Sequence, residues 1–146
     1  MLIAKKITAK DAIIFIILQI LGAGLGVLIA HGMFELDIFQ ISSNLRQGAS
    51  QGFSEIIATF GLILVIFGGL KLRADAIPAL VGFYITSAYW FTASTSFANP
   101  AVTLARSLSD TFAGINPSNI IMFISCQFIG MLVALILVKY IFSEKE

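Results

Sequence analysis

Four long apolar segments dominate this chain, and each has the length that a helix needs to cross a lipid bilayer. They cover residues 11–30, 52–70, 76–93 and 118–142, where a tilted transmembrane helix needs about 17–25 mostly apolar residues. Of the 146 residues, 58% are hydrophobic and only 12% are charged, which is more apolar surface than a soluble domain of this size can bury. The sequence therefore predicts an all-α membrane protein in which residues 1–146 form a single membrane domain.

The basic residues predict how the chain crosses the membrane. If the N-terminus is cytoplasmic, only Arg46 and Arg106 of the nine Lys and Arg residues lie outside. The other basic residues are Lys5, Lys6, Lys10, Lys71, Arg73, Lys139 and Lys145. Such an excess on the cytoplasmic side is the positive-inside pattern, so we expect a multi-pass protein of the inner (plasma) membrane with both termini in the cytoplasm. The net charge of +1 offers no basic surface for a nucleic acid, and the expected partner is the lipid bilayer.

A polar segment between the third and fourth spans contains the tripeptide Asn99-Pro100-Ala101. Proline restricts the residue before it and is favoured at the first position of a helix. The apolar residues that follow predict a half-helix over about 99–113, which is too short to cross a bilayer. Taken alone, the tripeptide is more typical of an ordinary Asn-Pro turn in an outer loop. Between two spans it indicates a re-entrant segment from the outer side, which is tolerated at membrane depth only when protein or a watery path surrounds it.

Small residues in the first and last spans predict close helix packing. Gly22 and Gly26 stand four residues apart, and the last span repeats the theme over residues 126–134, which lets helix backbones approach each other. Gln19 and Gln127 precede Gly22 and Gly130 by three residues each. The shared spacing indicates a weak internal repeat of two related halves, with chance in glycine-rich helices as the alternative.

The sequence contains no pattern that predicts an enzyme. The single histidine, His31, stands at a helix end and is interpreted as an interfacial residue. The single cysteine, Cys126, lies in an apolar run and is interpreted as a small residue that faces lipid or the core. Tyr89 and Trp90 are interpreted as helix-packing or interfacial aromatic residues. No nucleophile–base pair or ligand cluster is visible, so we expect neither catalysis nor a metal ion or cofactor.

Three motifs follow one another along the chain. They are Gln19-x-x-Gly-Ala23, Glu55-x-x-x-Thr59 and Ser94-Thr-Ser-Phe-Ala-Asn-Pro-Ala101. Together they resemble the major intrinsic proteins, the family of aquaporins and glycerol facilitators, and in particular its bacterial branch. The resemblance covers essentially the whole chain. It implies a passive channel for water and small neutral solutes, built from six spanning helices and two half-helices in inverted repeats, and assembled as a tetramer. The alternative to such a channel is a non-conducting membrane subunit or fragment that packs with other channel subunits.

The chain also departs from the pattern of that family. Its four spans resemble the third to sixth helices, while counterparts of the first two helices and of the first Asn-Pro-Ala half-helix are absent. The expected fold is therefore a truncated aquaporin-like domain with four transmembrane helices and one re-entrant half-helix. A truncated reading frame or a fragment accounts for this more simply than a natural four-helix protein or one half of a split channel.

The resemblance also assigns roles to individual residues. Asn99, with Pro100 and Ala101, matches the second pore motif, in which the asparagine donates a hydrogen bond to the passing solute. Glu55 matches a glutamate that braces the loop before this motif. An intramembrane carboxylate could instead relay protons, but apart from Asp11 and Lys139 near the span ends the spans hold no second charged residue, which favours bracing.

Three positions of the selectivity filter map onto Ser87, Ser96 and Val102. Because Val102 stands where the family usually has arginine, the filter should be wider and less basic, which favours solutes such as polyols and metalloid acids, for example arsenite, in addition to water. Arg106 lies one helical turn beyond Val102. It either substitutes in part for the missing arginine or, as we favour, lies in the outer vestibule near Asp110.

Overall fold

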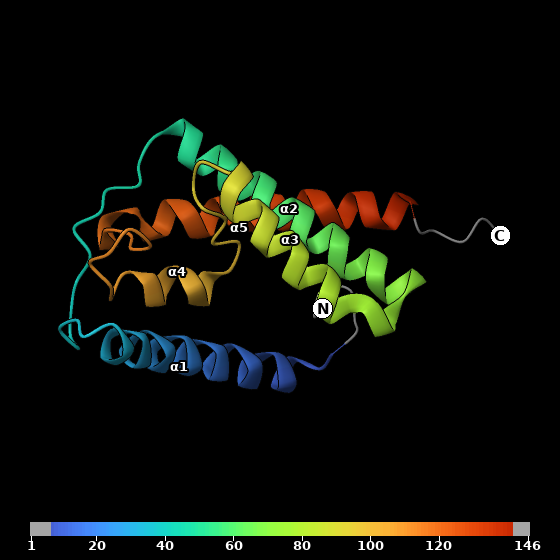
Figure 1. Ribbon diagram of the computed structural model, residues 1–146. Coiled ribbons are helices and arrows are strands. Elements are labelled where there is room, and N and C mark those ends of the chain that lie inside the picture. The colour runs from blue at the N-terminus through green and yellow to red at the C-terminus, as the bar shows by residue number, and fades with distance from the viewer. Residues whose placement is uncertain (1–6, 142–146) are drawn as a thin grey trace. The chain divides into compact units, whose positions relative to one another are not determined.

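The computed structural model describes residues 7–141, and this part of the chain is helical and contains no β-strand. Its α-helices, shown in chain order in Figure 1, are α1 Ala9–Met33, α2 Ala49–Leu72, α3 Ile77–Phe91, α4 Pro100–Arg106 and α5 Ile120–Ile141. Within the described residues, three helices are long and apolar enough to cross a membrane, namely α1, α2 and the helix over Pro117–Ile141 that contains α5. The predicted all-α membrane fold is thereby confirmed.

The described chain divides into two compact units. One, the α1 unit, contains the residues up to Asn44 together with Ala101–Pro117. The other, the three-helix unit, contains Leu45–Pro100 together with the residues from Ser118 onward. The boundary falls in the first turn of α4, so the Asn-Pro-Ala motif is divided between the units.

The start of α1 is fixed by a side-chain cap. The Thr8 hydroxyl oxygen accepts a hydrogen bond from the Asp11 backbone N–H at 3.2 Å and donates one to the Asp11 carboxylate at 2.7 Å. These contacts satisfy one of the free N–H groups of the first turn and place a negative charge at the positive end of the helix. At the other end the Phe34 N–H still bonds to the Ala30 carbonyl, and Glu35 leaves the helix with a left-handed φ of 56°. The helix is therefore longer at both ends than the predicted 11–30.

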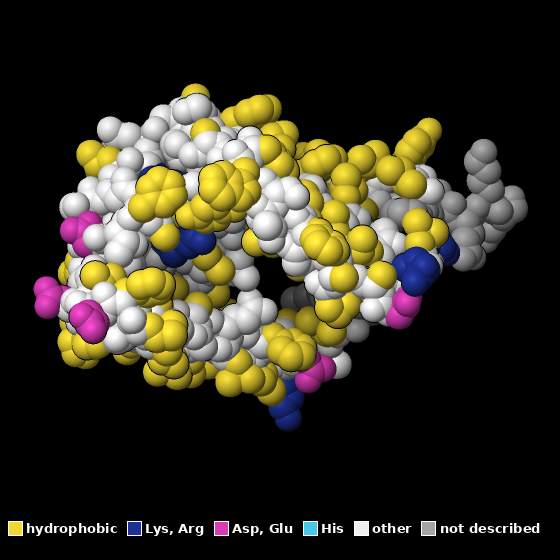
Figure 2. Space-filling model, viewed as in Figure 1, with side chains coloured by type: hydrophobic (Ala, Val, Ile, Leu, Met, Phe, Trp, Pro, Cys, Tyr) yellow, Lys and Arg dark blue, Asp and Glu magenta, His cyan; other side chains and the backbone are white. Residues whose placement is uncertain are grey.

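The outer surface of α1 is strongly apolar. Ile13, Leu21 and Ile29 each expose more than half of their side-chain surface. Figure 2 shows hydrophobic side chains spread over the visible face, with few charged groups among them. A helix with this surface is stable in lipid rather than in water, because exposed apolar area costs free energy in contact with water.

The three-helix unit is organised around α2, which packs against both α5 and α3. Gly130 of α5 permits the closest approach, because a Cβ atom there would overlap the backbone carbonyl oxygen of Ile56 in α2. Ala58, Phe123 and Ala134 are completely buried around this contact. The close packing predicted for the small residues of the last span is therefore present.

The small residues of α1 behave differently from the prediction. A Cβ atom added at Gly22 or at Gly26 would meet nothing within 4 Å, so neither glycine packs closely against another element of the α1 unit. Gly26 instead lies at the edge of a cavity. The physical reason is that no element of the α1 unit covers this stripe of the helix.

The predicted third span corresponds to α3, which is shorter than the predicted residues 76–93. It has 15 residues, which at 1.5 Å per residue gives about 22 Å, below the roughly 30 Å of a hydrocarbon core. The helix ends because Thr92 is extended and its hydroxyl bonds back to the Ala88 carbonyl at 2.7 Å.

The predicted half-helix over 99–113 is too long. In the structure α4 has seven residues and ends at Arg106. The following serine, aspartate and threonine residues compete for backbone hydrogen bonds and favour turns. The carbonyl of Ser107 accepts a hydrogen bond from the Ser42 N–H at 2.9 Å, and the Ile115 N–H donates to the Arg106 carbonyl at 3.2 Å. The segment after α4 is therefore a loop that pairs with the extended chain near Ser42.

Candidate functional site

Glu55 holds the loop that leads into Asn99. Its side chain projects from α2 and is completely buried. One carboxylate oxygen accepts a hydrogen bond from the Phe97 N–H and the other from the Ala98 N–H, each at 2.9 Å. The side-chain amide of Gln127 in α5 donates a third hydrogen bond at 2.7 Å. The carboxylate is the acceptor in all three hydrogen bonds, as expected for an ionised carboxylate, which can only accept.

The loop needs this support because its backbone is strained. Thr95, Ser96 and Ala98 have φ values of 61°, 48° and 50°, in the left-handed region that residues with a Cβ atom rarely adopt. Each such residue costs on the order of 1–3 kcal/mol unless its surroundings hold it. The charge-assisted hydrogen bonds to Glu55 offset part of that cost.

The chain passes directly from this loop into α4. Asn99 is half-buried and precedes Pro100, the first helical residue. Proline suits this position because its missing N–H would have no partner in the first turn. Asn99 and Pro100 belong to the three-helix unit, whereas Ala101 begins the part of α4 that belongs to the α1 unit.

Ser87 and Ser96, two of the predicted filter residues, have different surroundings within the three-helix unit. Ser87 lies exposed on α3, and its hydroxyl donates to the Phe83 carbonyl at 2.8 Å. Ser96 is only 4% exposed, and its hydroxyl oxygen has no hydrogen-bond partner among the described residues. A buried hydroxyl without a partner is uncommon, because most buried polar groups are hydrogen-bonded.

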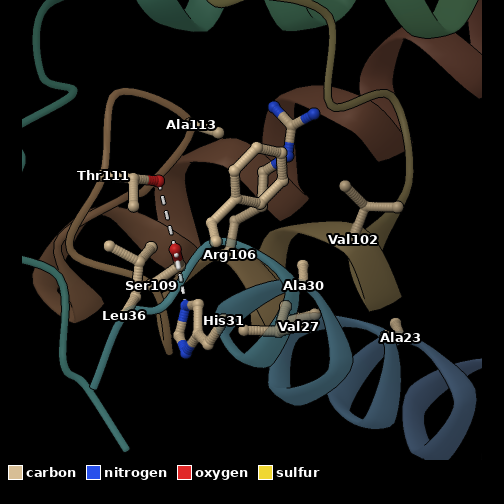
Figure 3. Close-up of a pocket in the computed structure, with 13 residues that line it drawn as sticks. Ala23, Val27, Ala30, His31, Leu36, Val102, Arg106, Ser109, Thr111 and Ala113 are labelled. Atoms are coloured by element: carbon tan, nitrogen blue, oxygen red, sulfur yellow. Dashed lines mark hydrogen bonds between the residues drawn. The ribbon is translucent and has the colours of Figure 1, made fainter. Parts of the chain in front are cut away.

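Val102 and Arg106 lie one helical turn apart on α4 and line one cavity of the α1 unit, of about 430 Å³. Figure 3 shows α4 on one side of this cavity and the C-terminal half of α1 on the other, with Val27, Ala30 and His31 facing inward. Most of the lining is apolar. The cavity brings together the predicted filter residue Val102 and the predicted vestibule residue Arg106.

Asp110 follows α4 in the same unit. Its carboxylate accepts hydrogen bonds from the Ser43 N–H at 2.8 Å and from the Ser43 hydroxyl at 2.9 Å. These two hydrogen bonds lower the pKa of the Asp110 carboxyl below its ordinary value. Asp110 thereby ties the loop after α4 to the extended segment before α2.

His31 is a site residue that the sequence interpretation missed. The side chain is 2% exposed, and Nδ1 lies 3.0 Å from the Ile38 carbonyl oxygen while Nε2 lies 3.0 Å from the Ser109 hydroxyl. A carbonyl oxygen only accepts, so in the neutral ring Nδ1 carries the proton and Nε2 accepts from Ser109. A further hydrogen bond of 3.1 Å joins Ser109 to Thr111 (Figure 3). His31 is thus part of a buried polar chain rather than an interfacial residue, and no local motif signals this, since Ser109 is 78 residues away.

Comparisons with known proteins identify the family of the chain. Residues 1–89 match the family described as Major intrinsic protein. A curated relative, the aquaglyceroporin AqpS of Rhizobium meliloti (strain 1021), is 44% identical over 139 residues, which cover 95% of this chain and 60% of the relative. The chain thus spans about 60% of the length of that relative. No solved structure matches the chain. The match over more than half of the chain shows that it belongs to the major intrinsic protein family.

Proposed function

We propose that this chain forms part of a passive channel for water and small neutral solutes, including polyols and metalloid acids such as arsenite. The observation that carries the proposal is the pair of hydrogen bonds that the Phe97 and Ala98 N–H groups donate to the Glu55 carboxylate. Both residues lie immediately before Asn99. A channel that recognises a neutral solute needs a donor at a fixed position. A strained loop held by a buried carboxylate provides such a fixed position.

In this proposal Asn99 donates to the solute and Glu55 braces the loop. Bracing is favoured over proton relay because both carboxylate oxygens already accept backbone hydrogen bonds. A relay residue must give and take protons, and it would have to release the loop to do so. The proposal therefore predicts transport that follows the solute gradient alone.

Ser87, Ser96 and Val102 form the proposed selectivity filter. The support for Ser96 is its buried hydroxyl, which has no partner among the described residues. The support for Val102 is its place in the wall of a cavity. A short branched apolar side chain there leaves more room than an arginine and adds no charge. We infer that the filter passes solutes larger than water, while Arg106 belongs to the outer vestibule.

The membrane arrangement is part of the same proposal. The basic residues favour a multi-pass protein of the plasma membrane with both termini in the cytoplasm. We further propose that the channel is a homo-oligomer, a tetramer by resemblance to its family, and a transporter rather than an enzyme.

The second candidate function is a non-conducting subunit that packs with other channel subunits. The observation that favours it is the uncovered small-residue stripe of α1, where Gly22 and Gly26 meet nothing within 4 Å. Such a stripe is the surface that another transmembrane helix packs against. Flux measurements on the chain alone distinguish the two functions.

The test uses a fused channel, defined as this chain joined to the part of the R. meliloti aquaglyceroporin that it does not cover. Stopped-flow light scattering of vesicles measures glycerol and water permeability for the native fusion and for Asn99→Leu. We expect rapid glycerol entry into vesicles that contain the native fusion, and a loss of most of that entry for Asn99→Leu, since leucine cannot donate a hydrogen bond. Equal permeability of the two would overturn the assignment of Asn99, and no flux from a folded native fusion would overturn the proposed function.

A further inference from the structure

Arg46 is a buried cation of the three-helix unit that lies in the segment just before α2. Its side chain is only 7% exposed. Its backbone N–H donates a hydrogen bond of 3.0 Å to the side-chain oxygen of Asn119, at the start of α5. This contact fixes the point from which the side chain departs. An arginine is rarely buried unless hydrogen bonds or an aromatic ring compensate its charge.

The guanidinium of Arg46 lies on the loop that carries Ser96. Its Nη1 donates to the Ser94 carbonyl oxygen at 3.0 Å, and its Cζ lies 5.1 Å from the centroid of the Phe97 ring. That distance is within the range of a cation–π contact. The Phe97 ring is in turn held by Phe123 of α5, with 5.1 Å between ring centroids. The positive charge is therefore held against the residues on both sides of Ser96.

The charge of the Arg46 guanidinium is affected both by burial and by neighbouring ionisable groups. Burial lowers the pKa of Arg46, while the nearby Tyr89 and Glu55 raise it in part. Arginine is the most basic side chain in proteins, so it stays protonated at physiological pH. Charges interact more strongly in a buried site than in water, because the effective dielectric constant is lower. Glu55 and Arg46 thus act on the same loop, Glu55 on its N–H groups and Arg46 on a carbonyl group and a ring.

We propose that Arg46 is the residue that excludes cations from this channel, in place of the arginine that Val102 replaces. The inference rests on the proposed function, since it names the charge that makes the proposed pore selective for neutral solutes. A fixed positive charge beside Ser96 repels cations and leaves uncharged solutes unaffected. The guanidinium is held by Ser94 and Phe97, so it adds this charge without placing a large side chain at position 102. The chain thereby combines a filter that is wide at Val102 with rejection of cations.

The experiment measures sodium entry and glycerol entry into vesicles that contain the fused channel. The variants are Arg46→Gln, which removes the charge but keeps a donor, and Arg46→Lys, which keeps the charge but loses the planar fork. Arg73→Gln is the matched control, because Arg73 is an exposed arginine of the three-helix unit that pairs with Asp75 at 3.0 Å. We expect Arg46→Gln to raise the ratio of sodium to glycerol permeability roughly tenfold or more, and Arg46→Lys and Arg73→Gln to leave that ratio near the native value.

Each result decides the proposal. An unchanged ratio in Arg46→Gln, with glycerol flux retained, would overturn this proposal alone. An equal fall of both fluxes in Arg46→Gln and Arg46→Lys would show that Arg46 only holds the loop. No glycerol flux from the native fusion would overturn the proposed function and this inference with it.

A second measurement keeps the proposal falsifiable if Arg46→Gln does not fold. The native fusion in a sodium chloride gradient should carry no sodium-selective current, because its fixed charge is positive. A reversal potential at the sodium equilibrium value would contradict the assignment of Arg46 without any substitution.

Discussion

At the scale of single residues, the loop before Asn99 owes its shape to Glu55. Its carboxylate accepts the Phe97 and Ala98 N–H groups at 2.9 Å each, and the Gln127 amide donates at 2.7 Å. A buried N–H that loses its acceptor keeps the full cost of having left water, about 1–3 kcal/mol. The geometry of the loop therefore depends on two oxygen atoms that both accept.

Replacing Glu55 with glutamine tests this dependence. A glutamine offers one acceptor oxygen and one NH₂ group, so one backbone N–H loses its partner and faces another donor. We expect Glu55→Gln to lower the free energy of unfolding by about 1–3 kcal/mol and to reduce solute flux through the fused channel. Glu35→Gln is the matched control, because Glu35 is exposed. Thermal unfolding in detergent and glycerol flux in vesicles are the measurements, and native values for Glu55→Gln in both would refute the bracing role.

Val102 is the residue that sets the width of the proposed filter. Arginine at this position adds a long, permanently charged group with a rigid set of donors. We expect Val102→Arg to lower glycerol and arsenous acid permeability roughly tenfold more than water permeability, which corresponds to about 1.4 kcal/mol of extra barrier. Val102→Thr, which is almost isosteric and uncharged, should keep the native ratio. If Val102→Arg retains flux with an unchanged solute-to-water ratio, Val102 does not line the filter.

The sequence motifs located these residues but not their contacts. The resemblance to the major intrinsic proteins suggested that Glu55 braces the loop. Its partners Phe97 and Ala98 lie 42 and 43 residues away in the sequence, so no local pattern identifies them. His31 shows the limit more clearly. Its partners Ile38 and Ser109 lie in loops, and no periodicity of the sequence indicates which loop residues meet.

At the scale of elements, long apolar runs predict helices well. The point at which a helix ends depends on whether its backbone groups form helical hydrogen bonds or hydrogen bonds to a neighbouring loop. The runs predicted α1, α2, α3 and α5, because about 20 apolar residues in lipid have no alternative to a helix. The prediction for α4 was wrong beyond Arg106. Its apolar content suggested three turns, whereas hydrogen bonds between the following loop and the Ser42 region end it after seven residues.

The contact between α2 and α5 permits a test at this scale. A Cβ atom at Gly130 would overlap the Ile56 carbonyl oxygen, so Gly130→Ala must push the two helices apart and should destabilise the three-helix unit by about 1–3 kcal/mol. Gly82→Ala is the control, because a Cβ atom there meets nothing within 4 Å and alanine favours helices. Thermal unfolding in detergent compares the two. A melting temperature for Gly130→Ala at or above that of Gly82→Ala would show that the helices are not in contact there.

At the scale of the whole molecule, the surface of the chain determines how it behaves alone. A Cβ atom at Gly22 or Gly26 would meet nothing within 4 Å, and small residues of this kind are where another transmembrane helix can pack closely. The chain spans about 60% of the length of its relative. We therefore expect further helices to cover this stripe.

Because other helices are expected to cover this stripe, we predict that the chain alone inserts into membranes but conducts little. Vesicles with the purified chain should show glycerol permeability close to that of empty vesicles, while vesicles with the fused channel should show rapid entry. Circular dichroism provides the control that the chain is helical in both preparations. Strong glycerol flux from the chain alone would show that copies of this chain complete the pore by themselves.

We propose that the fused channel moves neutral solutes passively. The most direct measurement is the ratio of internal to external labelled glycerol at equilibrium, in vesicles with the fused channel and an imposed proton or sodium gradient. We expect a ratio of about one under both gradients, reached faster than in empty vesicles, because the only driving force is the solute gradient. A ratio well above one under either gradient, abolished when that gradient is collapsed, would mean coupled transport and would overturn passive conduction.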